Sequence, residues 1–109
     1  MSHYLAKAIK VARGSPRPQK HATLILRGGA LCAWGTNSER QHAEVAAVRM
    51  LFPISQTPGT LVAVNIRIRK DGSLGIAAPC EECKIFLRGV GIHTVRYSTN
   101  EGGFAIMRL

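Results

Sequence analysis

A run of four apolar residues, Leu61 to Val64, constrains the fold of this chain more than any other feature. An uninterrupted apolar run in a strand indicates burial on both faces of a sheet, whereas alternation indicates one exposed face. Alternation begins directly afterwards, because isoleucines separate Asn65, Arg67 and Arg69. The sequence therefore predicts a central strand from Leu61 to Arg69 that is buried on both sides and carries a polar, basic face at its far end.

The residues after this strand predict a parallel partner for it. A short helix from Cys80 to Leu87 separates it from a second strand at Ile92 to Ser98. A strand, a helix and a strand in this order form a parallel pair with a right-handed crossover. Only Thr99 to Gly103 then precede a final strand at Phe104 to Leu109. This linker has room for a hairpin turn but not for a crossover helix, so we expect the last two strands to be antiparallel.

The N-terminal part of the chain predicts a helix and a hairpin. Apolar residues recur at helical spacing from Ser2 to Arg13, with basic residues on another face. The pair Gly28-Gly29 favours a tight turn, because glycine tolerates positive φ at both central positions. We predict strands on either side of it, at Ala22 to Leu26 and at Ala30 to Gly35.

Two finer predictions concern the neighbourhood of this hairpin. Cys32 and Trp34 should share one face of the second strand by the two-residue period, with Cys32 a small core residue. The Ser-x-x-Gln pattern from Ser38 to Gln41 is typical of a capping box and predicts a second helix that starts there. This helix should run to about Leu51 and end at Pro53.

Length and composition favour one compact α/β domain spanning residues 1–109. A length of 109 residues is typical of a single domain, and 46% hydrophobic residues suffice for one modest core. No apolar run approaches the roughly 20 residues of a membrane span, and Lys7 and Lys10 interrupt any signal-peptide core in the first twelve residues. The three cysteines are too few and too uneven for a disulfide framework. We therefore expect a cytoplasmic protein with no membrane partner.

The charge is strongly unbalanced. Fifteen lysines and arginines against six acidic residues give a net charge of +9, and residues 1–27 contain no acidic residue. Such a balance favours a polyanionic or phosphate-bearing partner, although a basic surface can also be incidental. The candidate nucleic-acid contacts lie on the first helix, the following loop and the far end of the central strand: Lys7, Lys10, Arg13, Arg17, Lys20, Arg67 and Arg69.

The segment Pro79-Cys80-Glu81-Glu82-Cys83 begins a predicted helix and carries metal-binding chemistry. Cysteines three apart project from the same side of a helix, and the helix N-terminus stabilises thiolates. A redox pair is the alternative, but Glu81 and Glu82 place negative charge beside it, which disfavours thiolates. A metal pair is therefore the preferred interpretation.

The segment His42-Ala43-Glu44 supplies a third candidate metal ligand and a carboxylate. His42 with Cys80 and Cys83 makes three ligands, and catalytic zinc sites use three protein ligands and leave the fourth position to water. Glu44 lies two residues from His42, where its carboxylate could move protons beside the metal. Taken singly, His42 could be an ordinary surface histidine, and Glu44 an acid that complements the helix dipole.

Together the two segments resemble the signature of the cytidine deaminase-like superfamily, His-x-Glu followed by Pro-Cys-x-x-Cys. The resemblance implies a three-layer α/β/α sandwich with a five-stranded mixed sheet and one zinc ion per chain. It implies that His42, Cys80 and Cys83 hold the zinc and that Glu44 is the catalytic proton shuttle. By the same resemblance Asn37 would contact the substrate sugar, and the base pocket would be lined by Ala43, Ala77, Ala78 and Pro79.

The sequence constrains the substrate less than it constrains the fold and the zinc ligands. An antiparallel final strand pair resembles nucleoside deaminases and toxin-type deaminases, whereas the histidine ligand resembles nucleotide and polynucleotide enzymes. The charge favours conversion of cytosine to uracil in single-stranded DNA or RNA, with Trp34, Tyr97 and Phe104 either stacking bases or lying in the core. The alternatives are a deaminase of free cytosine nucleosides or nucleotides, an adenosine deaminase on nucleic acid, and a non-catalytic zinc-binding module. The apolar helix faces would also allow a homo-oligomer.

Overall fold

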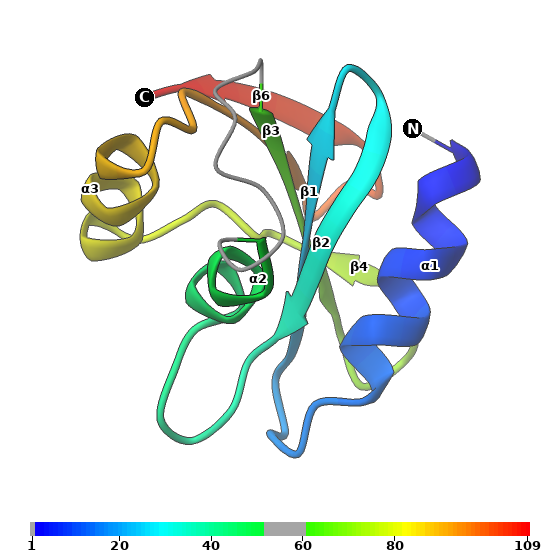
Figure 1. The fold of residues 1–109 in the computed structure, drawn as a ribbon. Helices are drawn as coiled ribbons and strands as arrows, with labels where there is room; N and C mark the ends of the chain where they lie inside the picture. Colours follow the sequence, from blue (N-terminus) through cyan, green and yellow to red (C-terminus); the bar gives the residue numbers. More distant parts are fainter. Residues whose placement is uncertain (1, 52–60) are drawn as a thin grey trace.

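The computed structural model describes residues 2–51 and 61–109 and contains three helices and six strands (Figure 1). The elements, in chain order, are α1 (Ser2–Arg13), β1 (Lys20–Arg27), β2 (Ala30–Thr36), α2 (Ala43–Leu51), β3 (Leu61–Ile68), β4 (Leu74–Gly75), α3 (Glu81–Gly89), β5 (Thr94–Ser98) and β6 (Phe104–Arg108). Among these residues, no helix combines the length and the apolar character needed to cross a membrane.

The strands form one mixed sheet in the order β2-β1-β3-β5-β6. β3 pairs antiparallel with β1 and parallel with β5, and β5 pairs antiparallel with β6. These pairings confirm the central strand, the parallel crossover and the antiparallel C-terminal pair. The two-residue strand β4, which pairs with the end of β3, was not anticipated because it is too short to show a period.

Helices cover both faces of the sheet, which gives three layers (Figure 1). α1 packs on one face, where Ala8 and Ala12 meet Leu24 and Ile66. α2 and α3 pack on the other, which includes the β1 residue Ile25. Both Leu24 and Ile25 are fully buried, because adjacent residues of a strand point to opposite faces. The three-layer α/β/α architecture is therefore confirmed.

The second helix begins later than the capping box predicts. α2 starts at Ala43, and its first turn is closed by a hydrogen bond from the Ala46 amide to the His42 carbonyl. The Ser38 hydroxyl accepts instead from the Arg40 amide within a local loop, so the capping box is wrong. This shift places His42 directly before the first helical residue. The predicted helix end at Pro53 lies outside the described residues.

The prediction that Cys32 and Trp34 share a face is also wrong. β1 residues Ile25 and Leu26 pair with Ala33 and Leu31, so Cys32 is an extra residue in β2. Such a bulge shifts the two-residue alternation by one position. Trp34 therefore packs on the α1 side, whereas Cys32 is half-buried at the edge of the core on the α2 side.

Gly35 sets how closely β2 approaches α2. A Cβ atom at this position would collide with the backbone nitrogen of Ala47 and would lie 2.6 Å from the Cβ of Ala46. We therefore expect Gly35→Ala to destabilise the fold by about 1–3 kcal/mol, because the helix must move away from the sheet. The melting temperature should fall by roughly 4–8 °C per kcal/mol in thermal denaturation followed by circular dichroism.

Gly89→Ala is the matched control, because a Cβ at Gly89 would have no neighbour within 4 Å. Its melting temperature should stay within about 2 °C of the parent protein, as expected of a neutral surface substitution. Equal melting temperatures for the Gly35 and Gly89 variants would show that α2 can shift at no cost.

Candidate zinc site and active-site pocket

Two helix N-termini bring three metal-binding side chains together. His42 immediately precedes α2, Cys80 is the N-cap of α3, and Cys83 lies in the first turn of α3. His42 Nδ1 lies 3.1 Å from the Cys83 Sγ and 3.8 Å from the Cys80 Sγ. All three ligand atoms lie within 4.8 Å of one another. The convergence expected from the two sequence motifs is therefore present in the fold.

The three ligand atoms are close enough together to share one tetrahedral zinc ion, although His42 Nδ1 and Cys83 Sγ lie nearer to each other than in a metal-bound site. Zinc–sulfur bonds of about 2.3 Å and zinc–nitrogen bonds of about 2.0–2.1 Å place neighbouring ligand atoms about 3.6–3.8 Å apart. Among the described residues, no fourth histidine, cysteine or carboxylate joins the group. One histidine and two cysteines would therefore leave one coordination position open, as in catalytic zinc sites.

The two cysteines differ in their surroundings. Cys83 is buried, whereas Cys80 is exposed. Burial raises the pKa of the Cys83 thiol, and the nearby negative charge of Glu44 raises it further. Because zinc binds the thiolate, metal binding must release this proton, and zinc affinity should increase as the pH rises.

Glu44 lies in the first turn of α2, with 8% of its surface exposed. Its Oε2 accepts a hydrogen bond of 3.0 Å from the side-chain amide of Asn65 on β3. Asn65 in turn accepts a hydrogen bond of 2.7 Å from the Thr23 hydroxyl on β1. The sequence pattern marks Asn65 only as a polar position on a strand, and nothing in it singles out Thr23. The two face the site because they are paired neighbours on the side of the sheet that α2 covers.

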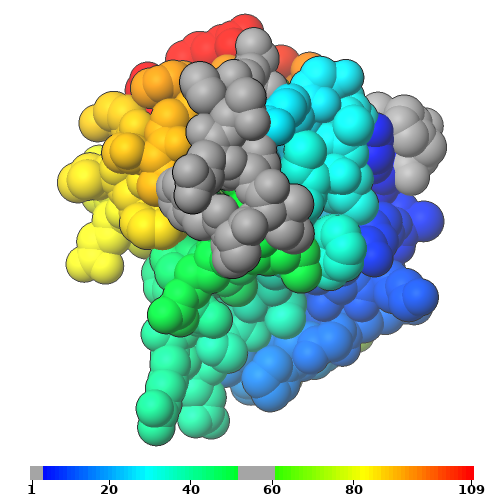
Figure 2. Space-filling view, viewed as in Figure 1, coloured from blue at the N-terminus to red at the C-terminus, as the bar shows by residue number. Residues whose placement is uncertain are grey.

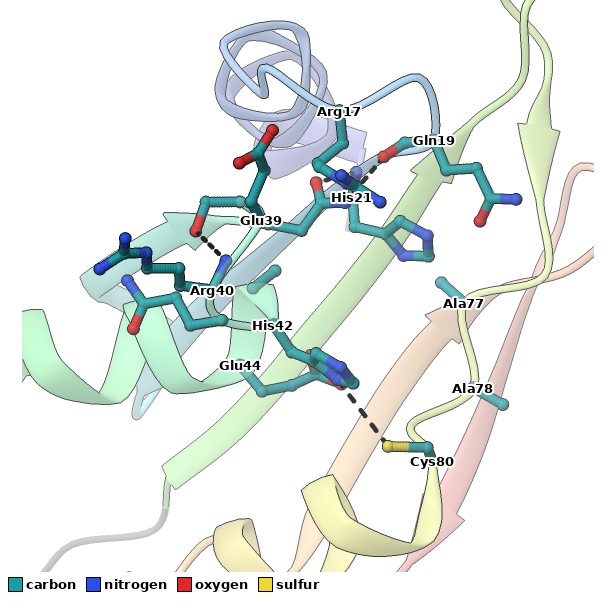
Figure 3. Close-up of a pocket in the computed structure, with 14 residues that line it drawn as sticks. Arg17, Gln19, His21, Glu39, Arg40, His42, Glu44, Ala77, Ala78 and Cys80 are labelled. Atoms are coloured by element: carbon teal, nitrogen blue, oxygen red, sulfur yellow. Dashed lines mark hydrogen bonds between the residues drawn. The ribbon is translucent and has the colours of Figure 1, made fainter.

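A pocket of about 470 Å³ opens in front of His42 and Glu44 (Figure 3). Its wall includes Ala43 and Ala78, both of which were expected to contact the base. Pro79 is not part of the lining. The complete lining is Arg17, Gln19, His21, Asn37, Ser38, Glu39, Arg40, Gln41, His42, Ala43, Glu44, Ala77, Ala78 and Cys80.

Asn37 lines the pocket, but its side chain is also bonded to the protein. Its Oδ1 accepts hydrogen bonds from the Ser15 hydroxyl and the His21 amide, at 2.7 and 3.0 Å. Its Nδ2 donates to the Gln19 carbonyl at 2.7 Å. Asn37 therefore ties the loop after α1 to the end of β2 and shapes the pocket rim, whatever contact it makes with a substrate.

His21 lines the pocket, although no sequence motif singles it out. Figure 3 shows its ring and that of His42 directed toward the segment that carries Ala77 and Ala78. Its pKa is lowered by burial and by the positive charge of Arg67, which favours a neutral ring. The signal that could have found it is the period of β1, because His21 and Thr23 share one face of that strand.

Most of the candidate nucleic-acid contacts lie away from the pocket; among them only Arg17 lines it. Lys7 Nζ lies 4.1 Å from the centre of the Trp34 ring, a cation–π contact on the α1 side of the sheet. Lys20 donates to the Ser15 carbonyl at 2.6 Å, and the Arg69 guanidinium donates to Asn100.

The remaining candidates divide between exposed and covered positions. Lys10 and Arg13 are exposed on α1, whereas Arg67 is half-buried on β3 and is paired with His21 of β1. The three aromatic candidates for base stacking, Trp34, Tyr97 and Phe104, are half-buried and absent from the pocket lining. Trp34 and Phe104 pack against the core beneath α1.

Comparison with known protein-family models and with curated protein sequences found no match. Solved structures do match. The apo dCMP deaminase from the cyanophage S-TIM5 superposes with a TM-score of 0.69 and 17% sequence identity, covering 93% of this chain and 84% of that one. The cytidine deaminases from Mycobacterium leprae and Mycobacterium tuberculosis both give a TM-score of 0.64 and 20% identity, covering 94% of this chain and 88% and 85% of theirs.

The chain therefore has the fold of the cytidine and dCMP deaminases. Both kinds of deaminase match this chain over more than nine-tenths of its length. Within this fold, His42, Cys80 and Cys83 form a group suited to one zinc ion. The resemblance inferred from the two sequence motifs is thereby confirmed at the level of the fold.

We expect purified protein to contain about one zinc ion per chain. Cys83→Ser should abolish stoichiometric zinc, because a serine hydroxyl does not replace a thiolate ligand. Cys32→Ser is the matched control and should retain the metal, because Cys32 lies outside the group. Elemental analysis of protein purified without chelators measures both. Equal zinc in the two variants would exclude Cys83 as a ligand.

Proposed function

We propose that this chain is a zinc-dependent hydrolytic deaminase that converts the cytosine of a free nucleotide to uracil. The observation that carries the proposal is the position of Glu44. Its carboxylate is buried beside the Cys83 thiol, whose pKa it raises, and it lines the same pocket as His42 and Cys80. A structural zinc site has no need of a buried carboxylate next to its ligands, whereas a hydrolytic site does.

The chemistry replaces the exocyclic amino group of the base with the oxygen of water and releases ammonia. Zinc, when bound, supplies a Lewis acid that lowers the pKa of water toward neutrality. Glu44 would take one proton from that water and pass it to the ring nitrogen of the base, and would then pass the second proton of the same water to the departing amine. The Ala77–Ala78 segment forms the facing wall of the pocket, where its peptide groups can hold the ring.

Two observations support a phosphate-bearing cytosine substrate. The matching solved structures are named as dCMP deaminase and cytidine deaminase, which supports the choice of cytosine. Arg17 and Arg40 lie on the rim of the pocket and can pair with a phosphate. The loop that carries Arg40, between β2 and α2, projects from the lower edge of the molecule in Figure 2 (teal).

Single-stranded DNA or RNA is the second candidate substrate. The net charge of +9 and the acid-free first 27 residues favour it. Against this, several of the basic residues expected to contact nucleic acid are engaged within the protein, among them Lys7, Lys20 and Arg69. The free nucleotide is therefore the preferred substrate.

Glu44→Gln should retain zinc and lose turnover by about 10²–10⁴-fold, because the amide keeps the shape of the side chain but cannot carry the proton. The measurement is ammonia release from dCMP and CMP, with zinc content determined on the same preparation. A Glu44→Gln variant with parental turnover would remove Glu44 from the mechanism.

Arg17→Gln and Arg40→Gln should raise KM for dCMP by about tenfold or more while leaving turnover of deoxycytidine unchanged, since only the nucleotide carries the charge that they bind. Lys70→Gln is the matched control, because Lys70 is exposed and does not line the pocket.

The same assay includes a mixed-sequence single-stranded oligonucleotide, read by sequencing. Conversion of the oligonucleotide, with none of dCMP or CMP, would overturn the nucleotide assignment in favour of the polynucleotide. Equal effects of the two arginine variants on nucleotide and nucleoside would refute a phosphate contact.

A further inference from the structure

Asn65 is a buried polar residue in the middle of the sheet, where the fold alone would favour an apolar one. It is only 4% exposed, and its cross-strand neighbour Thr23 is fully buried. Two residues along the same strands, the corresponding pair is Ile25 and Ala63, both in the apolar core. Burying an amide and a hydroxyl costs stability unless both are hydrogen-bonded, so this pair needs a reason other than packing.

The hydrogen bonds of Asn65 can be oriented without ambiguity. Nδ2 lies 3.0 Å from the Glu44 Oε2 and 3.3 Å from the Ala77 carbonyl oxygen. A carboxylate and a carbonyl only accept, so the amide nitrogen must face both of them with its two N–H groups. Oδ1 then faces the Thr23 hydroxyl at 2.7 Å, which must donate. The chain of donors therefore runs from Thr23 through Asn65 to Glu44.

This arrangement links the parts of the active site that come from different elements. Asn65 on β3 holds Glu44 on α2 and the carbonyl of Ala77 in the pocket wall. The Ala77 amide donates to the Ser98 carbonyl on β5, so the peptides on both sides of Ala77 are held. Asn65 thereby sets the distance between the carboxylate of Glu44 and the pocket wall that faces it.

We propose that Asn65, oriented by Thr23, is a positioning residue that holds the Glu44 carboxylate and the Ala77 carbonyl in the places that the reaction needs. This inference rests on the proposed function, because it assigns Asn65 to the same deamination. Asn65 acts through Glu44 and through the pocket wall and does not itself contact the reacting atoms.

The main test is Asn65→Asp in the full-length, zinc-loaded protein. The substitution keeps the size and shape of the side chain but turns both donors into acceptors facing Glu44 and Ala77. We expect kcat to fall by about 10²-fold, as for a misplaced catalytic group, with KM changed less than about threefold and zinc content unchanged. Asn100→Asp is the matched control and should keep parental kcat, because Asn100 is exposed on the turn between β5 and β6.

A second pair of variants covers the case in which Asn65→Asp does not fold. Thr23→Val removes the hydroxyl that orients Asn65 and keeps the side-chain shape, so it should lower kcat at constant KM. Thr23→Ser restores the hydroxyl and should recover most of the lost turnover. Parental kcat in Asn65→Asp, or equal turnover in Thr23→Val and Thr23→Ser, would overturn the proposal.

Thermal denaturation separates this inference from the proposed function, because it needs no substrate. In the double variant Asn65→Asp/Glu44→Gln the hydrogen bond can reform with its direction reversed. We expect the double variant to melt at a higher temperature than Asn65→Asp and to remain inactive. Equal melting temperatures would show that residues 65 and 44 do not interact and would overturn the inference, even if the parent protein deaminates cytosine. If the parent has no deaminase activity, the proposed function fails, and this comparison still decides whether Asn65 holds Glu44.

Discussion

The close packing of α2 and α3 against the same face of the sheet is the constraint on which the rest of the molecule depends. The parallel pairing of β3 with β5 requires a crossover, and its right-handed sense places α3 on the face that α2 already covers. Gly35 lets β2 approach the α2 backbone without an intervening Cβ. With both helices held in this way, their N-termini meet, and His42, Cys80 and Cys83 converge. The helix termini also supply the partial positive charge that thiolate ligands require.

Three of the buried polar residues that the structure describes, Thr23, Glu44 and Asn65, lie beside that convergence. The apolar residues of β1 and β3 fill both cores, whereas Thr23 and Asn65 interrupt the pattern where the sheet passes beneath Glu44. A buried carboxylate needs hydrogen-bond donors to remain charged away from water, and the Asn65 amide is one. The stability cost of burying these groups is offset by bonds that also orient the carboxylate. Stability and function are thus coupled through the same pair of strands.

Folding decides which basic side chains remain available to a binding partner. Two basic residues of the acid-free N-terminal segment make contacts within the fold: Lys7 lies over an indole ring and Lys20 bonds to a backbone carbonyl. Arg17 and Arg40 instead reach the rim of the pocket. A net charge therefore indicates a class of partner, but only the fold shows which charges are free to meet it.

The sequence alone determined the order of the three helices and the five longer strands, the central strand, the antiparallel C-terminal pair and the identity of the candidate zinc ligands. These follow from short-range patterns: apolar runs, the length of the last linker, and cysteines one helical turn apart. Only the tertiary structure decided that Cys32 and Trp34 lie on opposite faces, that α2 starts late, that His21 lines the pocket and that Asn65 bonds to Glu44. The bulge in β2 and the hydrogen bond between Thr23 and Asn65 depend on how strands pair, which no local pattern encodes. At Ser38 a local turn competes with the capping box, and the sequence pattern alone does not show which of the two forms.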